Sequence, residues 1–196
     1  TVEEGLEAAE QALGGLAASS LFWAAAGLSL LGLMALGRRG GEAPTGLRLA
    51  LFIAVGIGLH NLGEGLAIGA SLTAGEVALA SYLVMGFALH NVTEGIGIAV
   101  PVGAASVGFP VLAGLAAVAG VPAIVGTLLG VSAYAPHLAA LAFGIGAGAI
   151  AQVIIEVSLL LARRFEAAGG VLARGSVSGI AAGVAVMYAT SLVIQG

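Results

Sequence analysis

The chain has 196 residues, of which 60% are hydrophobic and only 8% are charged, whereas about a quarter of the residues in an average soluble domain are charged. It contains no cysteine, which excludes disulfides, Fe–S clusters and thiolate metal sites. Its formal net charge is −4, and its few Arg residues form no basic surface, which argues against a nucleic-acid partner. The composition indicates an integral membrane protein.

The first ten residues, TVEEGLEAAE, are acidic and amphipathic, and no Met precedes them. A signal peptide begins with basic residues instead. We therefore expect a processed or truncated beginning.

Six apolar segments follow, and each reaches the roughly 20 residues that a helix needs to cross a bilayer. They cover residues 16–36, 47–72, 77–100, 109–131, 137–162 and 177–194. The connections are short and rich in Gly, Pro and Ser, which is typical of tight turns between antiparallel helices. The sequence therefore predicts an all-α, polytopic transmembrane helix bundle, with residues 1–196 in a single domain.

The basic residues predict the orientation of this bundle. All of them lie in or beside the first and fifth loops, at Arg38, Arg39, Arg48, Arg163, Arg164 and Arg174. Six spans place these two loops on one side of the membrane, and the positive-inside rule makes that side cytoplasmic. We expect a multi-pass protein of the plasma or inner membrane, with both termini extracytoplasmic.

Two matching polar motifs lie near the middle of the second and third spans. They read HNLGEG at residues 60–65 and HNVTEG at residues 90–95. An ionisable side chain at the centre of a membrane helix costs about 2.5–3.5 kcal/mol on insertion scales, so such groups are rare unless they are paired, solvated or functional. The repetition of the motif in register indicates a shared function.

The spacing within each motif suits a metal ion. His at position i and Glu at i+4 lie on one helix face, with an Asn amide beside them. Because the two spans run antiparallel, these faces can meet near the bilayer centre. The candidate metal ligands are His60, Asn61, Glu64, His90, Asn91 and Glu94. Such nitrogen and oxygen donors suit zinc, iron(II), cadmium or manganese. The alternative is that each His and Glu only joins helices through hydrogen bonds.

A metal site inside a membrane bundle is compatible with a transporter, a channel or an intramembrane metalloenzyme. Mixed His, Glu and Asn ligands without thiolate favour a pathway for ions over a closed structural site. Two alternatives stay open: an intramembrane zinc-dependent hydrolase, and a metal-binding membrane subunit that does not transport.

The two motifs resemble those of the ZIP (Zrt/Irt-like) family of divalent-metal transporters, in particular its bacterial GufA-like branch. Two successive helices of that branch carry His-Asn-x-Pro-Glu-Gly and (His or Gln)-Asn-x-Pro-Glu-Gly. The resemblance implies an eight-helix fold, of which the spans predicted here are the last six. It also implies a primary ion bound by His60, Glu64, His90 and Glu94, and a second position bordered by Asn61 and Asn91.

The sequence departs from the family pattern at three points. Gly63 and Thr93 replace the motif prolines, and the 109–131 span has no carboxylate to complete a second metal position. The family's first two helices have no counterpart in this sequence. We therefore expect either a fragment of a longer chain or a reduced relative with six spans.

From these features we expect transport of divalent transition-metal cations toward the cytoplasm, with zinc first among them and iron, manganese or cadmium also accepted. The metal is then a transported substrate, and we expect neither enzymatic activity nor a cofactor. The expected partners are the metal ion and the lipid bilayer, with a homodimer as a candidate assembly.

Two further polar residues, Gln152 and Glu156, lie one turn apart in the 137–162 span. One interpretation makes them exit-route or auxiliary ligands, because the resemblance implies that this helix contributes polar groups near a vestibule. The other is that a Gln–Glu hydrogen bond helps to join helices. We interpret His137, at the start of this span, as an interfacial residue.

Overall fold

The computed structural model describes residues 14–38, 44–103, 107–133 and 136–195. The acidic beginning of the chain, Arg39 and Gly196 lie outside these ranges. Within them the long elements are all α-helices: α2 (Gly15–Gly37), α3 (Gly46–Thr73), α4 (Val77–Ala99), α5 (Phe109–Ala133), α6 (Pro136–Arg164) and α7 (Arg174–Gln195). Two short 3-10 turns, η1 (Glu166–Ala168) and η2 (Gly170–Leu172), connect α6 to α7. The all-α prediction is confirmed, and each predicted segment coincides with one helix.

Four of these helices are long and apolar enough to cross a membrane. They are the stretches Ser19–Gly37, Gly46–Thr73, Phe109–Ala133 and His137–Arg164, which belong to α2, α3, α5 and α6. Helix α4 carries His90, Asn91 and Glu94, which lower its hydropathy. The prediction of six spans is thus supported for four helices and stays a prediction for α4 and α7.

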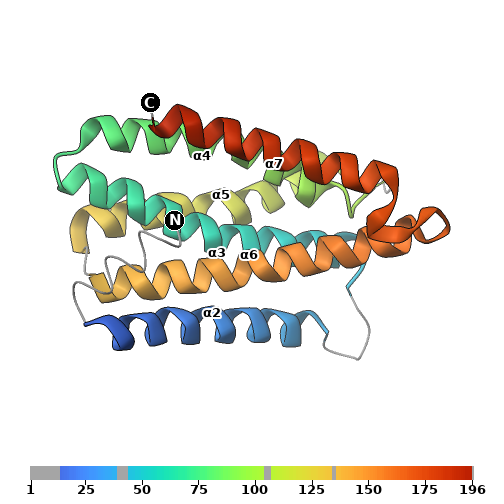
Figure 1. Cartoon of the computed structure of the whole chain (residues 1–196), viewed down its shortest axis with the longest axis horizontal. Helices are drawn as coiled ribbons and strands as arrows, with labels where there is room; N and C mark the ends of the chain where they lie inside the picture. The colour runs from blue at the N-terminus through green and yellow to red at the C-terminus, as the bar shows by residue number, and fades with distance from the viewer. Residues whose placement is uncertain (1–13, 39–43, 104–106, 134–135, 196) are drawn as a thin grey trace.

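Helix α3 is the central element of the bundle. It packs against α4, α5 and α6, whereas α2 packs mainly on α6 and α7 mainly on α4. Figure 1 shows the helices running side by side along the long axis of the molecule, with α2 and α7 on opposite edges. A polar group on α3 is therefore surrounded by other helices.

The contact between α3 and α5 is so close that the backbones touch. A Cβ atom on Gly65 would collide with the carbonyl of Ala123, and one on Gly126 would collide with the carbonyl of Leu62. Small residues permit this approach, which is a common way of joining helices in lipid. The glycines at these positions therefore serve helix packing.

Several polar side chains are buried in this bundle, while many large apolar side chains are exposed. Phe109 is 81% exposed and Leu28 is 73% exposed. The buried polar or charged side chains among the described residues are Asn61, Glu64, His90, Gln152, Glu156 and Ser176. An apolar exterior around buried polar groups is the distribution expected where lipid, and not water, surrounds the helices.

Candidate metal centre

Helix α3 presents His60 and Glu64 one turn apart on the same face. The Nε2 atom of His60 lies 3.4 Å from Oε1 of Glu64. The two side chains differ in exposure, at 32% for His60 and 8% for Glu64. The carboxylate is therefore enclosed, while the imidazole of His60 borders open space.

Helix α4 brings the third member, His90, to the same carboxylate. A short turn with Gly75 at φ +81° reverses the chain between α3 and α4, a conformation that glycine adopts without steric cost. The Nε2 atom of His90 then lies 2.7 Å from Oε1 of Glu64. Both imidazoles thus meet one carboxylate oxygen, as the antiparallel arrangement of the motifs predicted.

His60, Glu64 and His90 together form a group that can hold a metal ion. Each offers one ligand atom, and these atoms all lie within 4.8 Å of one another. Two imidazoles and one carboxylate are a ligand set that zinc accepts in proteins, with a fourth position left for water or substrate. A transition metal suits this site better than magnesium or calcium, which prefer oxygen ligands.

Contacts from α4 itself hold the His90 ring and backbone. The ring of Phe87 packs edge-on against the His90 ring, with centroids 5.6 Å apart. The hydroxyl of Thr93 donates a hydrogen bond to the His90 carbonyl at 2.6 Å. Thr93 occupies the position of the second motif proline, and α4 continues as a helix through it. A back-bonding hydroxyl can bend a helix without breaking it.

Glu94, the fourth expected ligand, lies outside the three-residue group. It is half-buried on α4, and its Oε2 atom is buried with no hydrogen-bond partner among the described residues. A buried carboxylate oxygen without a donor is costly unless a cation or water satisfies it. Its role as a ligand stays a prediction.

The two motif asparagines also present unsatisfied oxygens. Asn61 donates through Nδ2 to the carbonyl of Ala119 on α5, at 3.1 Å. Its Oδ1 atom and that of Asn91 are buried without a partner among the described residues. Oxygens of this kind fit the expected second metal position, which also stays a prediction.

Gln152 and Glu156 are buried on α6, at 1% and 2% exposure. Their Oε1 atoms have no hydrogen-bond partner in the described part of the chain. Gln152 lies beside Gly56 of α3, one turn before His60. Glu156 lies outside the His–Glu–His group, and both interpretations of the two residues stay open. His137 is exposed at the start of α6, as expected for an interfacial residue.

Sequence reasoning missed the contribution of α6 to the site. A Cβ atom on Gly146 would lie 3.2 Å from Cα of His60, and one on Gly63 would lie 3.3 Å from Cδ1 of Phe143. Helix α6 therefore packs directly beside the face of α3 that carries His60 and Glu64. The only signal in the sequence was the glycine at position 63, where the family motif has proline.

The sequence matches no protein-family model and no curated protein. The geometry of the three-residue group and the apolar helices around it are therefore the basis for assigning a function.

Proposed function

We propose that this chain moves divalent transition-metal cations, zinc foremost, across a membrane toward the cytoplasm. The observation that carries the proposal is the convergence of His60, Glu64 and His90 between helices of an apolar bundle. The ion exchanges part of its water shell for these ligands and is released on the other side. The metal is the substrate, and the reaction forms and breaks no covalent bond.

The ligands of this group favour a site through which the ion passes, and not a site that holds the ion permanently. A structural zinc site is closed by four protein ligands, often thiolates, whereas this group has three ligands and no cysteine. His60 is partly exposed, so one ligand already borders a route by which the ion enters or leaves. A site that conducts must bind strongly enough to admit the ion and weakly enough to release it.

Membership of the ZIP family is part of this proposal. The paired motifs at 60–65 and 90–95 support it, and the meeting of Glu64 with both histidines has the form that the resemblance implies. In that framework, Glu94 completes the first ion position. Asn61 and Asn91 then border a second one, where their unsatisfied oxygens provide ligand atoms.

A metal-dependent hydrolase is the second candidate. Two histidines and one glutamate with an open fourth position are also the ligand set of catalytic zinc sites, where the metal activates a bound water. Glu94 would then act as the general base. This candidate predicts product formation from an ester or amide by the purified chain, without movement of metal across a vesicle membrane.

Metal uptake into proteoliposomes that contain the full chain and an entrapped zinc indicator tests the proposal. His90→Ala removes the nearer imidazole and leaves Glu64 without its 2.7 Å partner, so we expect the uptake rate to fall at least about tenfold. The matched control is His137→Ala, because His137 lies outside the group, and it should transport at the wild-type rate.

Undiminished uptake by His90→Ala would contradict the assignment of the site. Zinc binding by the wild-type chain without any flux would favour a metal-binding subunit that does not transport. Hydrolysis without flux would favour the second candidate.

A further inference from the structure

Phe143 of α6 packs closely on the helix of the candidate metal site, at Gly63. A Cβ atom on Gly63 would lie 3.3 Å from Cδ1 and 3.7 Å from Cε1 of Phe143, and the shorter distance is tighter than ordinary van der Waals contact. Gly63 directly precedes Glu64 and follows His60 by three residues. The aromatic ring therefore lies at the level of the metal ligands.

The same ring packs against an apolar cluster that includes the neighbour of His90. This cluster consists of Ala67 on α3 with Leu83 and Phe87 on α4, and Phe143 packs against it from α6. Phe87 in turn contacts the His90 ring edge-on. A continuous series of contacts thus leads from Gly63 through Phe143 and the cluster to the imidazole of His90.

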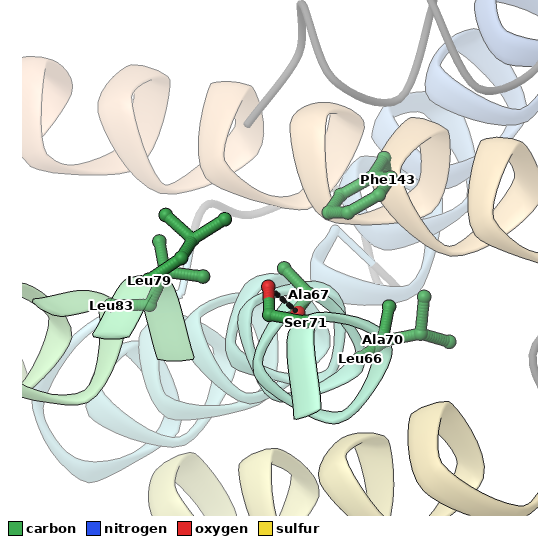
Figure 2. Close-up of a pocket in the computed structure, with 7 residues that line it drawn as sticks. All are labelled: Leu66, Ala67, Ala70, Ser71, Leu79, Leu83 and Phe143. Carbon is green, nitrogen blue, oxygen red and sulfur yellow. Dashed lines mark hydrogen bonds between the residues drawn. The ribbon is translucent and has the colours of Figure 1, made fainter. Parts of the chain in front are cut away.

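Phe143 also borders an apolar cavity of about 190 Å³ between α3, α4 and α6. Figure 2 shows Phe143 on the opposite side of this cavity from Leu79 and Leu83. The hydroxyl of Ser71 in the cavity wall already donates to the carbonyl of Ala67, at 2.9 Å. The cavity leaves one side of the ring open, and the other sides contact Gly63, this cluster, and a second cluster of Leu66, Ala139 and Ala142.

We propose that Phe143 is a positioning residue for the metal centre. Seated on Gly63, it supports the cluster that contains Phe87 and so keeps Nε2 of His90 directed at Oε1 of Glu64. Phe143 has no polar atom that could bind an ion, so it acts only through His90. The inference rests on the proposed metal site and assigns to α6 a part in forming it.

Co²⁺ titration of the full chain in lipid nanodiscs tests this inference, because the visible absorption of bound Co²⁺ reports the geometry of its ligands. Phe143→Ala removes the support, so we expect Co²⁺ affinity to fall about 10- to 100-fold, as for other residues that orient a ligand. The absorption spectrum should also change. Phe143→Leu keeps an apolar side chain at this position and should restore most of the Co²⁺ affinity and of the wild-type spectrum.

The matched control is Phe109→Ala, since Phe109 is 81% exposed. This variant should bind Co²⁺ as the wild type does.

A second variant acts on the same contact without removing the ring. Gly63→Ala pushes Phe143 toward the cavity, which can accommodate a small displacement, so we expect a folded chain with a smaller spectral change. In the Phe143→Leu background the effect of Gly63→Ala should shrink, because residues in contact give non-additive effects. This pair tests the inference even if Phe143→Ala does not fold.

The outcomes separate the inference from the proposed function. Wild-type affinity and spectrum in folded Phe143→Ala, or strictly additive effects of Gly63→Ala and Phe143→Leu, would overturn the positioning role while the metal site stands. Absence of Co²⁺ binding by the wild-type chain would overturn both.

Discussion

Glu64 is the residue on which the candidate site depends, because a single oxygen of its side chain contacts both imidazoles. Oε1 lies 2.7 Å from Nε2 of His90 and 3.4 Å from Nε2 of His60. Without an ion, this arrangement is a hydrogen-bonded carboxylate between two rings, which by itself would also suit a purely structural role. The unpartnered oxygens of Asn61, Asn91 and Glu94 favour a cation, because buried acceptors are rarely left without a donor.

Metal binding at this group should weaken on acidification. A histidine must be neutral and a glutamate ionised to bind a metal, so protons compete with the ion for His60, Glu64 and His90. We therefore expect zinc affinity to rise with pH across the range in which the imidazoles lose their protons. Isothermal titration of the full chain at several pH values in buffers of different ionisation enthalpy measures both the affinity and the protons released. Zinc affinity that does not change with pH would contradict the assignment of these ligands.

At the scale of the helices, α3 is held in place by close contacts with α5 on one side and α6 on another. Toward α5 it presents glycines, so that the backbones meet, as at Gly65 beside Ala123. Toward α6 it receives the ring of Phe143 on Gly63. With two faces fixed in this way, the face that carries Glu64 is directed at α4, where His90 completes the contact.

The α3–α5 contact should therefore be sensitive to one added methyl group. Gly126→Ala places a Cβ against the carbonyl of Leu62, so we expect it to destabilise the bundle by about 1–3 kcal/mol, the usual cost of overpacking. The matched control in the same helix is Gly120→Ala, which has open space around its Cβ. It should leave stability unchanged or raise it by up to about 1 kcal/mol, because Ala favours helix.

Denaturant unfolding of the two variants in the same detergent, followed by circular dichroism, measures this difference. Equal stability of Gly126→Ala and Gly120→Ala would show that α3 and α5 are not in backbone contact.

At the scale of the whole molecule, the distribution of side chains suits a bilayer. The outer faces carry exposed Leu, Val, Ile and Phe, whereas the described ionisable groups near the middle of α3 and α4 are at least partly buried. All of the Arg residues adjoin two of the connections between helices. This asymmetry leads to a prediction about which loops face the cytoplasm.

The natural absence of cysteine permits a direct test of topology with single cysteine variants. Ala74→Cys, in the turn between α3 and α4, should react with a membrane-impermeant maleimide in intact cells. Ala167→Cys in η1, and Val100→Cys at the end of α4, should react only after permeabilisation, because the positive-inside rule places both on the cytoplasmic side. All three positions are exposed. Labelling of Val100→Cys in intact cells would mean that α4 does not span.

The sequence by itself predicted a membrane protein and the positions of the helices, and its six candidate ligands include the three residues of the His–Glu–His group. Apolar segments of bilayer length that are separated by turn residues predict transmembrane helices. His60, Glu64 and His90 were identifiable because ionisable groups at the centre of such segments are too costly to occur without a partner. The sequence could not show which helices touch, because small and apolar residues permit many pairings.

Only the tertiary structure decided how the ligands meet. It placed one oxygen of Glu64 between both imidazoles, left Glu94 outside that group, and set Phe143 on Gly63 beside them. These outcomes depend on the rotation and separation of packed helices, which are fixed by backbone contacts such as Gly126 against Leu62. A difference of about one turn in register would separate the same residues by roughly 5 Å, and no pattern within a single helix encodes that register.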